Sequence, residues 1–239
     1  MGSRSRSARV AGVLYLAIIA IGVTGLLYVP SVVYVSGNAA ATAHSLVAHE
    51  NLFRAGIFLE LCGATLEIFL VLALYGLLGG VDRSLAILMV ILGLMDVPIF
   101  FVNALNSFGA LLFAGGADFL SAFSEPQRQA MAMLFLKLHH DGEIVNEVFW
   151  GLWLLPFGML VYKSGFLPRF LGVWLILNCF AYLAQSVAGI LLPQYAQTVA
   201  SVAAPLQFGE IALTLWLLIM GVNVKRLGAH EGCKARGCA

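Results

Sequence analysis

The chain has 239 residues, of which 61% are hydrophobic and 10% are charged, whereas a soluble domain carries roughly 25% charged residues. This composition excludes an ordinary soluble domain, and the formal net charge of +1 gives no electrostatic reason to expect nucleic acid as a partner. Apolar runs of about 20 residues, enough for a helix to cross a bilayer, follow one another along the chain. Because the alternation of a β-barrel is absent, we expect an all-α, polytopic membrane helix bundle.

Six transmembrane helices are predicted, separated by short polar or glycine-containing segments. They cover residues 10–35, 53–78, 84–114, 143–162, 168–192 and 199–224. The membrane domain is thus expected over residues 10–224, between an N-terminal segment of residues 1–9 and a C-terminal tail of residues 225–239. The first apolar run is about 26 residues long. Since the apolar part of a secretory signal is about 7–15 residues, this run predicts a retained span.

The polar segment before the fourth predicted span has helix signals of its own. Ser124 can cap a helix and Pro126 suits its first turn, which predicts a short interfacial helix over residues 126–138. Asp141 and Gly142 would separate this helix from the fourth span, although the pattern also allows one continuous helix. In the sixth span, Pro205 removes a backbone donor and can kink the helix.

Lysine and arginine residues predict the orientation. If the N-terminus is cytoplasmic, ten of the 13 basic residues lie on the cytoplasmic side. These ten are Arg4, Arg6, Arg9, Arg83, Lys163, Arg169, Lys225, Arg226, Lys234 and Arg236, and the others are Arg54, Arg128 and Lys137. Because cytoplasmic loops are enriched in lysine and arginine, both chain ends are predicted to be cytoplasmic, which requires an even number of spans.

Four stretches of the sequence resemble one bacterial protein family. They are residues 8–15 (ARVAGVLY), 51–54 (NLFR), 151–156 (GLWLLP) and 164–172 (SGFLPRFLG). They are similar to six-span integral membrane proteins defined as a domain of unknown function (DUF4386-like), and the last stretch, with its fixed order of Gly, Pro and Arg, is the most specific. The resemblance implies this topology and a location in the bacterial cytoplasmic (inner) membrane. It brings no activity and no catalytic residues.

The predicted spans contain polar residues that are costly in a bilayer. They are Glu60 and Glu67 in the second span, Asp96, Asn103 and Asn106 in the third, Glu143, Asn146 and Glu147 in the fourth, and Asn178, Gln185, Gln207 and Glu210 in the last two. A carboxylate at mid-membrane costs several kcal/mol unless it is paired, protonated or hydrated, so such residues generally face the bundle interior and are functional candidates.

In the predicted orientation these polar residues occupy the extracytoplasmic half of the bundle. We therefore predict an acidic pocket open to the outside and closed by apolar packing below, with Glu67, Asp96 and Glu210 at its floor. The predicted ligand-binding residues are Glu60, Glu67, Asp96, Asn103, Glu147, Gln207 and Glu210. The alternative is that these side chains hydrogen-bond one another and hold the helices together.

Histidine suggests candidate metal ligands. His139, Glu143 and Glu147 follow at steps of four and so share one helical face. The plainer interpretation is that His139 is an interfacial residue where a helix meets water. His230, Cys233 and Cys238 in the tail form a further pattern, but three ligands with no fourth favour a solvated tail. No cofactor follows from the sequence.

Three functional hypotheses remain. The preferred one is a transporter-like or receptor-like pocket for a small polar or cationic solute or for protons, because acidic residues in the spans outnumber basic ones. The second is a membrane enzyme with an extracytoplasmic His/carboxylate site that acts on a lipid-like substrate. The third is a non-catalytic membrane partner subunit. The lipid bilayer is the expected partner in all three, and the sequence fixes neither enzymatic activity nor oligomeric state.

Overall fold

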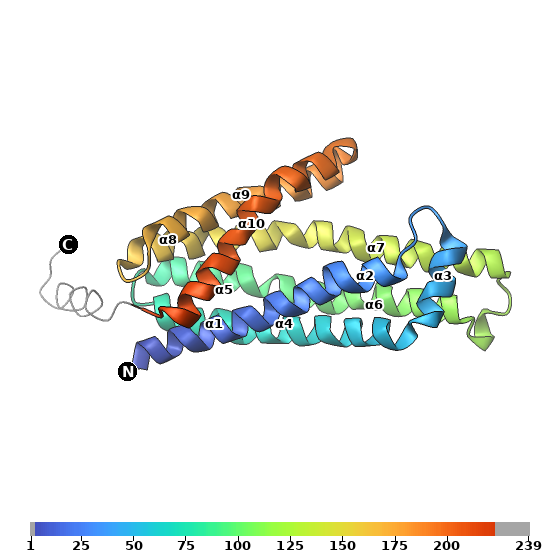
Figure 1. Ribbon diagram of the computed structural model, residues 1–239, viewed down its shortest axis with the longest axis horizontal. Helices are drawn as coiled ribbons and strands as arrows, with labels where there is room; N and C mark the ends of the chain where they lie inside the picture. Colours follow the sequence, from blue (N-terminus) through green and yellow to red (C-terminus); the bar gives the residue numbers. More distant parts are fainter. Residues whose placement is uncertain (1–2, 223–239) are drawn as a thin grey trace, which may run out of the picture.

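A computed structural model describes residues 3–222 of the chain, and α-helices form most of this part (Figure 1). The α-helices are α1 (Ser3–Gly22), α2 (Val29–Val33), α3 (Ala39–Ala48), α4 (Glu50–Leu78), α5 (Arg83–Leu94), α6 (Asp96–Gly115), α7 (Glu125–Leu152), α8 (Leu154–Ser164), α9 (Arg169–Leu191) and α10 (Ala196–Ile219). A π-helix, η1 (Val23–Tyr28), joins α1 to α2. The predicted tail, with His230, Cys233 and Cys238, lies outside the described residues.

Within residues 3–222, six helical segments are long and apolar enough to cross a membrane by length and composition. They are Ser5–Val33, Glu50–Leu78, Arg83–Gly115, Glu125–Ser164, Arg169–Leu191 and Pro193–Ile219. The prediction of an all-α bundle with six membrane-spanning helices is therefore confirmed. The chain is a multi-pass membrane protein whose long helices contact lipid.

The two ends of the described chain lie at one end of the bundle. Figure 1 shows the start of α1 and the end of α10 together at the left, which we call the terminal end. The opposite, distal end holds α3 and the connection between α6 and α7. Such an arrangement suits an even number of spans. That the terminal end is cytoplasmic stays a prediction from the lysine and arginine pattern.

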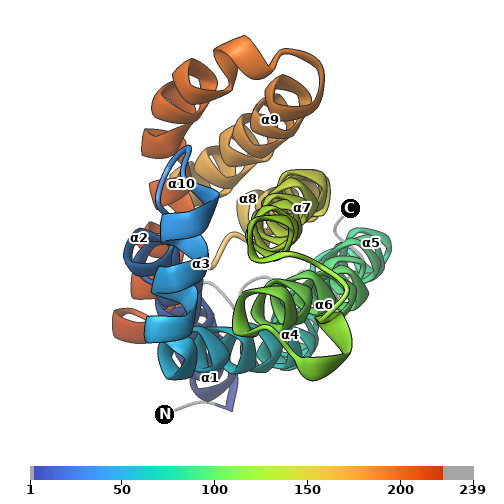
Figure 2. The same ribbon diagram turned by 90° about the vertical axis from the view of Figure 1, so that its right-hand side faces the viewer.

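Helix α7 lies at the centre of the bundle. Viewed from the distal end, it lies between the α9–α10 pair and the group formed by α4, α5 and α6 (Figure 2). Ser124 and Gln127 start α7 with a reciprocal capping box. The helix then continues to Leu152 without the break that Asp141 and Gly142 suggested. Because a Cβ at Gly142 would lie 2.4 Å from Asn103 Oδ1, this glycine admits the Asn103 side chain rather than ending the helix.

The main apolar core fills the terminal half of the bundle. Leu70, Leu74, Phe157, Leu160 and Leu213 are fully buried there, together with neighbours from all six spans. At this end the Lys163 ammonium lies 3.0 Å from the Asp82 carboxylate and links the last turn of α8 to the start of α5. The backbone N–H of Leu85 and the Lys163 ammonium hold the pKa of Asp82 below its usual range.

Close helix packing at the terminal end depends on a pair of glycines. A Cβ at Gly158 would lie 2.6 Å from the carbonyl oxygen of Gly172, and a Cβ at Gly172 would lie 2.6 Å from the carbonyl oxygen of Gly158. Real Cβ atoms do not approach backbone this closely, so α8 and α9 pack backbone against backbone, as small residues permit in membrane bundles.

Three of the six spans are interrupted, and each interruption precedes a proline. The π-helix lies before Pro30, α5 gives way to α6 at Met95 before Pro98, and α7 gives way to α8 at Trp153 before Pro156. Proline has no N–H to donate to the carbonyl four residues earlier, which weakens the helix at that point. By contrast, α10 continues through Pro205.

Candidate functional site

A cavity of about 700 Å³ lies beside these interruptions, and this volume is within the range of small-molecule sites. Residues of α1, η1 and α2 line one side of it, and residues of α4, α6 and α7 line the other. Tyr182 of α9 and Glu210 of α10 complete the deep end. The cavity extends toward the distal end as far as Tyr34, which is 48% exposed.

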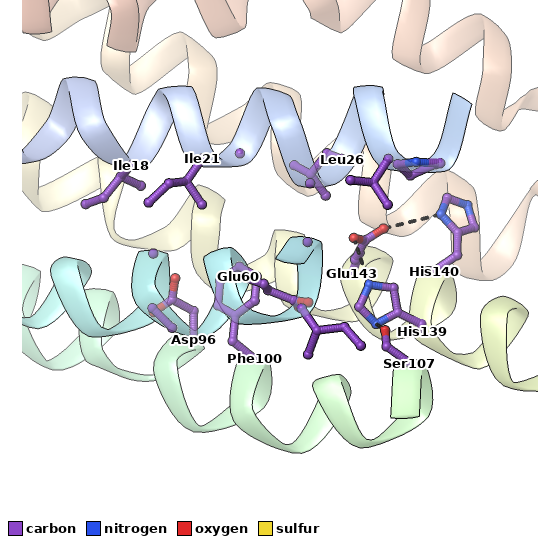
Figure 3. A pocket seen from close by; sticks show the side chains of 18 of the residues that line it. Ile18, Ile21, Leu26, Glu60, Asp96, Phe100, Ser107, His139, His140 and Glu143 are labelled. Carbon is purple, nitrogen blue, oxygen red and sulfur yellow. Dashed lines mark hydrogen bonds and ion pairs between the residues drawn. The ribbon is translucent and has the colours of Figure 1, made fainter. Parts of the chain in front are cut away.

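The two long walls of the cavity differ in chemistry. The wall from the first span is apolar, and Figure 3 shows Ile18, Ile21 and Leu26 extending toward the side chains of Glu60 and Asp96. The facing side carries acidic groups at several depths. The carboxyl side chains that line the cavity are Glu60, Glu67, Asp96, Glu143 and Glu210.

Glu67 and Asp96 form the part of the floor that has no basic partner among the lining residues. Their exposed fractions are 9% and 8%, and Asp96 Oδ1 has no hydrogen-bond partner within the described structure. Their carboxyl groups are close enough to repel one another when both are charged. Asp96 is held at this place because α6 begins there, directly after the interruption at Met95.

Glu210 has a different environment although it faces the same cavity. Its Oε2 accepts a hydrogen bond from the Tyr15 hydroxyl at 2.5 Å, and its Oε1 accepts one from Asn178 Nδ2 at 2.8 Å. The Tyr182 hydroxyl also interacts with this carboxyl group. Glu210 therefore links α10 to α1 and α9 through hydrogen bonds.

Aromatic rings surround the acidic floor. The Phe100 and Trp150 rings stack with centroids 5.9 Å apart, and Trp150 meets Tyr182 edge-on at 6.0 Å. On the other side, the ring centroids of Tyr15 and Trp153 lie 6.0 Å apart. All five rings line the cavity, and the Trp150 indole faces the Asp96 carboxyl group.

Histidines occupy the distal part of the cavity. His139 Nε2 lies 3.4 Å from one oxygen of Glu143, and His140 Nδ1 lies 3.5 Å from the other. The Ser107 hydroxyl lies 3.1 Å from His139 Nδ1, and Asn103 Nδ2 donates to the His139 carbonyl at 2.9 Å. This part of the cavity is thus a hydrogen-bonded polar network.

The basic side chain that lines the cavity is Lys137, at the distal end. Its ammonium lies 2.6 Å from Asp141 Oδ1 and is 60% exposed, so it is paired outside the floor. Among the described lining residues, no lysine or arginine reaches Glu67 or Asp96.

The structure brings some of the predicted ligand-binding residues together and leaves others apart. Glu60, Glu67, Asp96 and Glu210 line one cavity. Asn103 lies behind the wall, bonded to the His139 carbonyl, while Glu147 and Gln207 are not among the lining residues. His139 and Glu143 face each other, but in residues 3–222 no three His, Cys, Asp or Glu side chains are grouped to hold a metal ion.

The aromatic part of the site was not predicted. The candidate residues identified from the sequence include no aromatic side chain, whereas Trp150 and Trp153 line the cavity. A usable signal was present, because prolines within apolar runs mark interrupted helices, and such interruptions in membrane proteins border cavities. Pro98 lies two residues after Asp96, and Pro156 lies three residues after Trp153.

The fold and the cavity define a multi-pass α-helical membrane protein. Residues 10–221 match the family described as "Domain of unknown function (DUF4386)", so the chain belongs to this family, and the predicted resemblance is confirmed. A protein of Archaeoglobus fulgidus described as "Uncharacterized protein" is 29% identical over 77 residues, which is 32% of this chain and 44% of that protein. The chain thus matches less than half the length of that relative. No solved structure matches the chain.

Proposed function

We propose that the protein binds a small cationic solute in this cavity, as a transporter or as a receptor-like binding protein. The observation that carries the proposal is the pair Glu67 and Asp96, which are buried on the cavity wall without a basic partner among the lining residues. A buried carboxylate without a partner is unfavourable in a membrane, and a bound cation would offset that cost.

The interrupted spans support a binding role. Transporters often form their solute sites where membrane helices are broken, because irregular backbone is tolerated there only next to protein or a water-filled cavity. Here Gly25 of the π-helix, Asp96 directly after the interruption at Met95, and Trp153 at the interruption of the fourth span all line the cavity. If the terminal end is cytoplasmic, the cavity faces outward, since the apolar core fills the terminal half.

One arrangement favours an enzymatic alternative. Ser107, His139 and Glu143 are connected in the order hydroxyl, imidazole and carboxylate, with distances of 3.1 and 3.4 Å. This is the order of a nucleophile, a base and an orienting acid, so a hydrolase acting on a lipid-like substrate is the second candidate. Covalent labelling by a fluorophosphonate that disappears in Ser107→Ala would establish it, and absence of labelling would exclude a nucleophilic Ser107.

Cation binding by the purified full chain tests the main proposal. Binding of sodium, potassium, magnesium and organic ammonium ions is measured by calorimetry for the native protein, Glu67→Gln and Asp96→Asn. Glu147→Gln is the matched control, since Glu147 lies in the fourth span but does not line the cavity. We expect at least one cation to bind, both floor variants to weaken its binding about tenfold or more, and the control to bind normally.

The outcome that would overturn the proposal is specific. If no cation binds the native protein, or if both floor variants bind as the native protein does, then Glu67 and Asp96 do not form a cation site. Uptake of the bound cation into sealed proteoliposomes then separates the two classes: a transporter accumulates it, whereas a receptor-like protein binds it without uptake.

A further inference from the structure

The rings around the floor provide surfaces that recognise a particular kind of cation. Aromatic faces attract cations within about 6 Å of the ring centroid, and clusters of such rings recognise organic ammonium groups. Phe100, Trp150 and Tyr182 form one connected series of rings beside Asp96, and Tyr15 with Trp153 forms another. An ammonium group at the floor would meet carboxyl oxygens and π faces at the same time.

The same floor is poorly suited to a bare metal ion. Hard cations such as Mg²⁺ and Ca²⁺ are held by about six or more oxygen ligands, partly from water. Of the three floor carboxyls, Glu210 is already occupied by Tyr15 and Asn178, and the remaining space is bordered by aromatic rings. Within residues 3–222, no group of three or more potential ligands is placed for a metal.

The wall from the first span would receive the apolar part of such a ligand. Ile18, Ile21 and Leu26 form this wall opposite the acids (Figure 3). A Cβ added at Gly22 or Gly25 would meet no atom within 4 Å, so the π-helix leaves space next to the wall. The cavity volume of about 700 Å³ exceeds what a hydrated inorganic ion requires.

We propose that the cavity binds an organic ammonium ion with apolar substituents, its charge placed between Glu67 and Asp96 and its apolar part against the first span. This inference rests on the proposed function and adds the ligand class. An independent observation also points to a ligand. The Asp96 side chain lines the cavity, is only 8% exposed, and has no hydrogen-bond partner for its Oδ1. The ammonium can belong to a free amine or to the headgroup of an ethanolamine lipid.

The direct test compares matched probes on the delipidated full chain in detergent. The probes are phenethylammonium, its uncharged counterpart 2-phenylethanol, tetrapropylammonium, and the chlorides of sodium, potassium and magnesium. We expect both ammonium ions to bind, and 2-phenylethanol and the metal ions to bind at least tenfold more weakly. Asp96→Asn should weaken ammonium binding about tenfold or more, and Trp150→Leu should weaken it roughly 2- to 30-fold, the range for a cation–π contact.

A steric variant keeps the inference testable if a floor variant fails to fold. Gly25→Leu places a side chain in the open space beside the wall, so it should abolish tetrapropylammonium binding and leave thermal stability unchanged. Gly76→Leu is the matched control, because Gly76 is exposed on α4, outside the cavity lining, and also has no atom near its Cβ. Normal tetrapropylammonium binding by a folded Gly25→Leu would overturn the placement of the apolar part.

Lipid vesicles identify the source of the ammonium. If it belongs to a headgroup, phosphatidylethanolamine should compete with phenethylammonium whereas phosphatidylglycerol should not; if it belongs to a free amine, neither lipid should compete. Metal binding that depends on Asp96, without ammonium binding, would overturn this inference and leave the proposed function standing. Equally tight binding of 2-phenylethanol would overturn this inference, and binding of neither kind of cation would overturn both.

Discussion

Two amide substitutions at the cavity floor should change stability in opposite directions. Glu210 accepts hydrogen bonds from Tyr15 and Asn178, and Glu210→Gln places an NH₂ group where one of these donors now finds an oxygen. A buried donor left without an acceptor costs about 1–3 kcal/mol. Asp96 has no basic partner and an unbonded Oδ1, so Asp96→Asn removes a buried acid and should stabilise the protein by about 0.5–2 kcal/mol.

These free energies convert into measurable temperature shifts. For a chain of this size 1 kcal/mol moves the Tm by about 2–4 °C. We therefore expect Glu210→Gln to lower the Tm by about 2–12 °C and Asp96→Asn to raise it by about 1–8 °C. The measurement is thermal unfolding of the purified protein, followed by tryptophan fluorescence in one detergent without added cations.

A double-mutant cycle supplies the control. Tyr15→Phe removes the hydroxyl that Glu210 binds, so Tyr15→Phe and Glu210→Gln should not be additive, while Tyr15→Phe and Asp96→Asn should be close to additive. If Asp96→Asn lowers the Tm as much as Glu210→Gln does, Asp96 is a structural hydrogen-bonding residue. The reasoning that separates binding carboxyls from structural ones would then be refuted.

Three further results are expected. Gly158→Ala should cost about 1–3 kcal/mol or more because α8 and α9 must separate, whereas Gly76→Ala, with open space around it, should leave the Tm nearly unchanged. The pKa of Asp82 is lowered in the folded protein, so its pairing with Lys163 stabilises the fold above about pH 4, the ordinary pKa of aspartate. This stabilisation is lost as the pH falls through the lowered pKa. The Tm difference between the native protein and Lys163→Ala should therefore shrink at acid pH. In a background without native cysteines, an impermeant maleimide applied to intact cells should label Ser121→Cys and not Lys163→Cys, and the reverse result would contradict the predicted orientation.

Composition was sufficient to predict the architecture. A hydrophobic fraction of 61% excludes an ordinary soluble domain, and apolar runs of about 20 residues without the alternation of a β-barrel indicate membrane helices. The acidic residues could also be assigned to one half of the bundle, because depth follows from position along a span. Five of them line a common cavity.

Rotation about the helix axis could not be predicted with the same certainty as depth. Four residues advance an α-helix by about 400°, so a step of four also turns by about 40°. Glu143 lines the cavity and Glu147, one such step later, does not. Interruptions at Met95 and Trp153 change the phase of the following segment further, and their positions depend on prolines whose effect is decided by tertiary contacts. Pro205, within a continuous α10, shows that proline alone does not decide it.

The interruptions also determine where the bundle can bend. Each one removes backbone hydrogen bonds from a span, so bending stiffness is lowest there, and Gly93 on the third span lies against Trp153 at the break in the fourth. The terminal half, where α8 and α9 are in backbone contact, has no such weak point among its described residues. A force on the bundle, whether from a ligand or from lateral membrane tension, would therefore deform it around the cavity before it disturbed the apolar half.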